Sequence, residues 1–195
     1  MATSKVKICN RALAMIGEAA RIINLDESSE TARLCRLMYE DLLHAVLEEH
    51  PWGFAHCRKD LGGPVLPAPA FGFRFAYQVP NDCIKVLEIY DSKGTQIKEE
   101  MSWEREGDRL VIDVPNRIFI KYTRKVEDAG LYPPLFVEAL VARLSAELSE
   151  PLAKQNSLTD RLWGIYNRKI ARAKSSSARE QAQKRAVVGT WAGGR

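Results

Sequence analysis

The sequence lacks long apolar runs and paired cysteines. No apolar run in its 195 residues approaches the ~20 residues of a membrane-spanning helix, so we expect no membrane span. The N-terminus also lacks the apolar stretch of a secretory signal peptide. Cys9, Cys35, Cys57 and Cys83 are widely spaced and form no CxxC pair, which indicates reduced thiols of the cytosolic type.

Motifs that bind phosphates, nucleophiles or catalytic metals are missing as well. The sequence contains no GxGxxG, P-loop, GxSxG or HExxH pattern. His50, His56 and Cys57 cluster, but their spacing matches no common zinc site. Glu48 and Glu49 are adjacent, and neighbouring side chains on a helix point in different directions, which makes a poor acid/base pair. We therefore expect no enzyme, no cofactor and no metal site.

Charge is distributed unevenly along the chain. Residues 161–195 hold nine Lys or Arg and one acid, Glu180, for a net charge of +8, whereas residues 1–160 carry −4. Basic arms of this kind bind nucleic acid or acidic protein surfaces. Because the basic segment lacks interleaved aromatic residues and a recognised reading helix, we disfavour sequence-specific DNA binding and favour docking to a protein.

Apolar spacing and turn signals predict an α+β fold. Helical periodicity predicts four helices, at about 4–17, 29–49, 134–150 and 156–174. Proline is expected to end two of them, at Pro51 and Pro151. Alternating segments separated by turn residues predict one small antiparallel meander within about 72–126. Its predicted strands are residues 73–79, 84–90, 95–98, 109–114 and 117–125.

These elements predict a four-helix bundle with a small antiparallel sheet inserted between its helix pairs. We expect an adaptor domain over residues 1–174 and an extended basic docking arm over residues 175–195. The arm carries no apolar stripe, so on its own it should be disordered and should fold onto a partner.

Six short segments follow one another along most of the chain. They are residues 10–18 (NRALAMIGE), 51–55 (PWGFA), 76–86 (AYQVPNDCIKV), 120–123 (IKYT), 136–140 (FVEAL) and 144–152 (LSAELSEPL). In their order and spacing they resemble the tail tubular protein A family, the head-to-tail adaptors, or gatekeepers, of short-tailed phages. Beyond Ser175 the chain shares with the family only a basic C-terminal extension, not a sequence motif.

The resemblance implies a structural virion protein. Members of the family form a dodecameric ring between the portal protein and the tail nozzle, a tail tubular protein B-like partner. The ring lines the channel through which genomic DNA leaves the head, without sequence-specific binding. The net negative charge of residues 1–160 suits the lining of such a channel. Each DNA phosphate that the lining neutralised would add salt-dependent affinity and hold the DNA back.

The candidate portal-docking residues come from charge and composition. They are Arg168, Arg172, Lys174, Arg179, Gln181, Lys184, Arg185 and Trp191. Trp103, Trp163 and Trp191 lie among polar residues, as interface tryptophans do, and Trp191 is the best candidate for an anchor in a partner's pocket. Two alternatives stay open: a tail-associated peptidoglycan hydrolase, and a nucleic-acid-binding module that uses the basic C-terminal arm.

Overall fold

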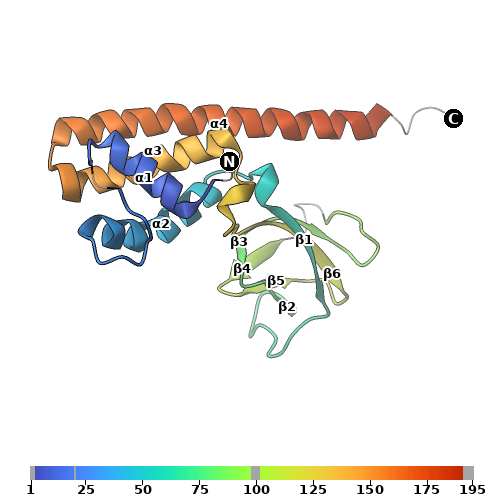
Figure 1. Ribbon diagram of the computed structural model, residues 1–195. Helices are drawn as coiled ribbons and strands as arrows, with labels where there is room; N and C mark the ends of the chain where they lie inside the picture. The colour runs from blue at the N-terminus through green and yellow to red at the C-terminus, as the bar shows by residue number, and fades with distance from the viewer. Residues whose placement is uncertain (1–2, 20, 98–101, 191–195) are drawn as a thin grey trace. The chain divides into compact units, whose positions relative to one another are not determined.

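The computed structural model describes residues 3–19, 21–97 and 102–190, with side chains described up to Ala182 (Figure 1). It is a mixed helix-and-sheet protein with four α-helices and two small antiparallel sheets, which confirms the α+β class. None of the helices in these ranges is both long and apolar enough to cross a membrane.

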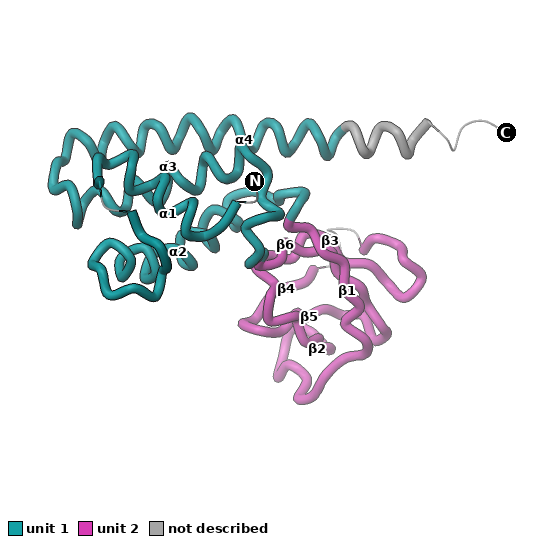
Figure 2. Tube along the Cα trace, viewed as in Figure 1, with its two compact units in different colours: residues 1–54, 126–195 teal, residues 55–125 magenta. Residues whose placement is uncertain are grey.

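The chain divides into two compact units (Figure 2). A helical unit comprises Met1–Phe54 and Val126–Arg195, and a sheet unit comprises Ala55–Lys125. The four helices fall in one unit although they come from both ends of the sequence, and the expected boundary between residues 1–174 and 175–195 stays a prediction.

Serine caps begin the first two helices. Helix α1 spans Lys5–Met15 and α2 spans Glu30–Glu48. The hydroxyl oxygens of Ser4 and Ser29 each accept a hydrogen bond from a first-turn N–H, at 3.2 and 3.3 Å, and so satisfy donors that a helix start leaves unpaired. Gly17 follows α1 with a φ of +85°, a conformation that costs glycine little.

The last two helices run longer than expected. Helix α3 spans Pro134–Ala153 and α4 spans Asn156–Thr190, with α4 lying along α3 (Figure 1). The predicted end at Pro151 is wrong, since the proline sits inside the last turn and α3 stops before Lys154, whose φ is +51°. The predicted end of α4 near Lys174 is also wrong. After three serines, residues 178–186 (AREQAQKRA) consist only of strong helix formers.

The sheet unit contains two three-stranded antiparallel sheets with strand orders β1-β6-β3 and β2-β5-β4. The strands are β1 His56–Gly62, β2 Phe75–Gln78, β3 Cys83–Tyr90, β4 Trp103–Glu106, β5 Arg109–Ile112 and β6 Ile118–Arg124. The expectation of one meander is wrong, because β6 pairs with both β1 and β3. Sequence analysis also missed β1 and β4, and of the predicted strand at 95–98 only an isolated bridge from Gln96 to Tyr90 is found in the described residues.

The two sheets of this unit share one apolar core. Tyr77 and Leu110 come from one sheet, and Val86, Ile120 and Tyr122 come from the other; all are buried. Ten buried residues form this cluster, so the sheet unit has a core of its own.

Candidate docking surface on the C-terminal helix

One face of α4 packs into the helical unit. Leu162, Tyr166, Ile170 and Ala173 recur at three- and four-residue spacing and are buried. No described residue of α4 after Ala173 is buried, so the apolar seam ends there. The helix itself continues, and polar contacts replace the seam.

The first of these polar contacts centres on Glu49, the residue that follows α2. Its carboxylate accepts hydrogen bonds from the Tyr166 hydroxyl and from Lys174 Nζ, the latter at 2.8 Å. Burial, together with the bond to Glu49, raises the pKa of Tyr166, which keeps the phenol a donor. Lys174 thus holds α4 against the end of α2, and its expected docking role stays a prediction.

The second polar contact lies two turns further along α4. Gln181 Nε2 donates to the backbone oxygen of Pro51 at 2.8 Å and to Ser177 Oγ at 3.2 Å. Its side chain also lies against Gly53, where an added Cβ would meet it at 3.6 Å. Gln181 therefore ties the helix to the turn after α2, and its expected docking role stays a prediction.

Four arginines lie on the opposite face of α4. Arg161, Arg168, Arg172 and Arg179 are separated by 7, 4 and 7 residues. At 3.6 residues per turn this spacing places them within about 20° of one line along the helix. All four are exposed, and the line rises about 27 Å at about 1.5 Å per residue. We call these four residues the arginine row.

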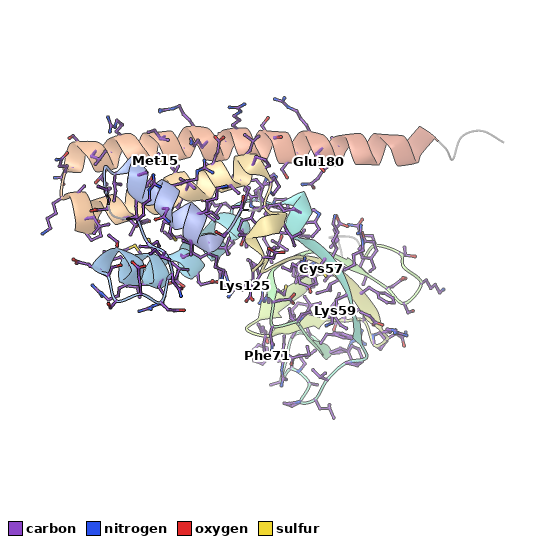
Figure 3. The ribbon with its side chains drawn as sticks, in the orientation of Figure 1. Met15, Cys57, Lys59, Phe71, Lys125 and Glu180 are labelled. Atoms are coloured by element: carbon purple, nitrogen blue, oxygen red, sulfur yellow. The ribbon has the colours of Figure 1, made fainter. Side chains whose placement is uncertain are left out.

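The arginine row has no carboxylate partner in the described part of the chain. Its only side-chain hydrogen bond there runs from Arg179 Nη2 to Ser175 Oγ at 3.1 Å. Arg168 and Arg172 stand four residues apart, where like charges destabilise a helix by about 0.2–0.5 kcal/mol. Long nitrogen-tipped side chains project from the face of α4 turned away from α3 (Figure 3). This row is a concentrated positive surface that the fold itself does not use.

The lysines of the same helix behave differently. Lys169 Nζ lies 3.6 Å from a carboxylate oxygen of Glu138 on α3, and Lys174 is paired with Glu49. Within the described part of α4, the lysines therefore pair with carboxylates of neighbouring helical segments, whereas the arginines point to solvent. Arginine suits an outward role, since its planar guanidinium can grip a carboxylate or phosphate through two parallel hydrogen bonds.

Of the expected docking residues, the structure brings Arg168, Arg172 and Arg179 together. Sequence analysis left Arg161 out of that set, although the 7-4-7 spacing was a sufficient signal to include it. The side chains of Lys184 and Arg185, and all of Trp191, lie outside the described residues.

Trp163, an expected interface residue, is engaged inside the helical unit. The Arg143 guanidinium lies 4.4 Å from its ring centroid and 5.3 Å from that of Tyr166. Trp103, on β4, is half-buried against the core of the sheet unit. Both rings are therefore engaged within their own unit rather than free to insert into a partner's pocket.

The residues weighed for other chemistry are placed as follows. Glu48 is exposed at the last position of α2, while Glu49 is held by Tyr166 and Lys174 as described above. Within residues 3–19, 21–97 and 102–190, no three His, Cys, Asp or Glu side chains are grouped so that they could hold a metal ion.

No family model matches this chain, and no curated protein is significantly similar to it.

Proposed function

We propose that the protein is a head-to-tail adaptor of a short-tailed phage virion, which docks to the portal through the arginine row. The observation that carries the proposal is the row itself: Arg161, Arg168, Arg172 and Arg179 on one exposed face, with no carboxylate partner in the described chain. The resemblance of residues 10–152 to the tail tubular protein A family supports the choice of partner.

The proposal keeps the finer architecture expected from the sequence. The four helices form a bundle, and the sheet unit is an insertion in the sequence between α2 and α3. Residues 175–195 act as a docking arm. In the assembled ring, the acidic residues 1–160 face DNA without holding it, while the basic C-terminal segment grips an acidic portal surface. The ring is dodecameric, and a tail nozzle binds its other side.

Charge reversal of the row tests this proposal. We compare the wild-type chain with the triple variant Arg168→Glu, Arg172→Glu, Arg179→Glu for binding to the purified portal ring of the same phage. A matched control reverses three exposed arginines elsewhere in the helical unit, Arg11→Glu, Arg21→Glu and Arg33→Glu, so that both variants change the net charge equally.

The two variants should differ clearly. Each arginine–carboxylate contact at a wet interface contributes about 0.5–1 kcal/mol, so losing three weakens portal binding roughly tenfold to a hundredfold. The control should bind within about twofold of wild type. Equal binding by all three proteins would refute the assignment of the row.

A nucleic-acid-binding function is the second candidate, and the same row favours it, because four aligned guanidiniums also fit phosphates. The variants are therefore also titrated with duplex DNA over a range of salt concentrations. Tight DNA binding with a steep salt dependence that the row variant loses, without any portal binding by the wild type, would replace the adaptor proposal with this one.

A further inference from the structure

One face of α2 carries charge opposite to that of the arginine row. Glu30, Leu37, Asp41 and Glu48 are exposed and follow one another at separations of 7, 4 and 7 residues. At 3.6 residues per turn they lie within about 20° of one line, which rises about 27 Å at about 1.5 Å per residue. We call these four residues the acid row.

The fold does not use the carboxylates of the acid row. Glu30, Asp41 and Glu48 form no side-chain hydrogen bond or ion pair with any residue in the described part of the chain. Arg33, the nearest basic residue of α2, lies about 60° to one side of the row and is likewise unpaired there. The acid row therefore presents three uncompensated negative charges to solvent.

Leu37 adds an apolar side chain to the acid row, and it is 64% exposed. The aliphatic stem of an arginine covers such a side chain while the guanidinium stays in water at the edge of the contact. A helix with arginines at the spacing of the acid row therefore engages all four of its positions.

The arginine row on α4 has this spacing. Its four residues are separated by 7, 4 and 7 positions, like those of the acid row, so the two rows match in length and direction along their helices. The pattern is the same when it is reversed. Parallel and antiparallel alignments therefore both give three arginine–carboxylate contacts and one arginine–leucine contact. Gly164, Ala171 and Ser175 flank the arginine row, and small side chains let two helix axes approach closely.

A single chain does not make this contact with itself. All eight residues of the two rows are exposed, and no carboxylate of the described chain forms an ion pair with the arginine row. Both rows lie on described helices of one compact unit. Their pairing therefore requires a second copy of the chain.

We infer that the acid row of one copy binds the arginine row of a second copy, with α2 of the first lying along α4 of the second. The contact is heterologous, because two different surfaces meet. Portal docking uses the same arginines, so the two contacts exclude each other: the free chain pairs with a second copy, and the portal displaces α2. The inference goes beyond the adaptor proposal and is measured on the chain alone.

Charge reversal of the acid row tests the contact. Self-association of the full-length chain is measured by sedimentation equilibrium for the wild type and for the variant Glu30→Arg, Asp41→Arg, Glu48→Arg. An ionic strength of about 0.1 M gives a Debye length of about 10 Å, which preserves contacts between adjacent charges and screens the net charge. A matched control reverses three exposed acids outside the row, Glu104→Arg, Glu106→Arg and Glu150→Arg, so that both variants change the net charge equally.

Reversal of both rows in one chain provides a rescue. This variant adds four changes to the acid-row variant: Arg161→Glu, Arg168→Glu, Arg172→Glu and Arg179→Glu. Each row then meets opposite charge again. All changed residues are exposed, and unchanged circular dichroism verifies that each variant is folded.

We expect the wild type to self-associate and the acid-row variant to do so at least about tenfold more weakly, since three ion pairs are lost together. The control variant should lose less than about threefold, the effect of net charge alone. Reversal of both rows should restore self-association to within about threefold of the wild type. A wild type that stays monomeric up to about 1 mM, equal losses in the acid-row and control variants, or no recovery in the folded double reversal would each overturn the inference.

Failure of this inference and failure of the adaptor proposal are distinguishable. Self-association is measured without the portal, and portal docking depends on the arginine row but not on the acid row. Self-association that the acid row controls, without portal binding by the wild type, overturns only the adaptor proposal. Portal binding by a chain that stays monomeric on its own overturns only the contact between copies.

Discussion

Replacing Trp52 by alanine should strongly destabilise the helical unit. Trp52 is only 2% exposed, and its ring packs against Phe136 and against His50, with the ring centroids of Trp52 and His50 4.9 Å apart. Its indole Nε1 donates to the backbone oxygen of Val46 at 2.8 Å. Val46 lies in the last turn of α2, where helix carbonyls lack partners, so the indole caps α2.

The magnitude follows from these contacts. Truncating a buried tryptophan to alanine costs about 3–5 kcal/mol, including the cavity that it leaves. The Val46 carbonyl loses its donor, which adds about 1 kcal/mol. We therefore expect Trp52→Ala to lower the free energy of unfolding by about 4–6 kcal/mol, a large part of the ~5–15 kcal/mol that holds a typical domain folded.

Urea unfolding followed by the helical circular-dichroism signal measures this loss. Trp52→Phe is the control, because phenylalanine keeps an aromatic ring but lacks the N–H, so it should lose only about 1–2 kcal/mol. A loss below about 1.5 kcal/mol for Trp52→Ala, or equal losses for the two variants, would refute the role of Trp52 as both core residue and cap.

Three further predictions concern polar side chains. Glu49→Gln removes the charge that holds Tyr166 and Lys174, and should cost about 1–2 kcal/mol in urea unfolding; an unchanged midpoint would contradict it. Burial, with the charge of Lys174, holds the pKa of His50 below 6.5. The unfolded chain then binds this proton more readily, so His50 should lower stability as pH falls below 6.5. An NMR titration that gave His50 a pKa at or above 6.5 would contradict this. Tyr77→Phe deprives two backbone carbonyls of its hydroxyl and should destabilise the sheet unit by about 1–2 kcal/mol; thermal unfolding at an unchanged temperature would argue against it.

Much of the helical part could be predicted from sequence, because its signals are local. Serine caps and apolar spacing fix the starts of α1 and α2, and Gly17 marks the end of α1. The length of α4 could not be predicted from apolar spacing, since its second half has no apolar seam and forms a helix through residue propensity.

The strand errors have a different cause. Strand β1 includes Arg58, Lys59 and Asp60, and its alternation is too weak to mark a strand before its partner β6 is known. Pairing of β1 with β6 joins residues about 60 positions apart, and no local pattern encodes such a register. The single-meander expectation failed for the same reason.

The candidate site was partly accessible from the sequence. The 7-4-7 spacing of the arginine row is visible in the sequence and defines one helix face as soon as α4 is known to continue past Lys174. The inward roles of Lys174 and Gln181 were not accessible, because their partners Glu49 and Pro51 lie 125 and 130 residues earlier.

The mass of the assembled complex tests the adaptor proposal most directly. Light scattering and negative-stain microscopy are applied to the chain alone, to the purified portal ring alone, and to their mixture. The proposal predicts a shift of the portal peak by the mass of a dodecameric ring of this 22.0 kDa chain, seen as a cap on one end of the portal. Coexistence of unaltered portal rings with unbound chain, at concentrations well above those in a lysing cell, would contradict it.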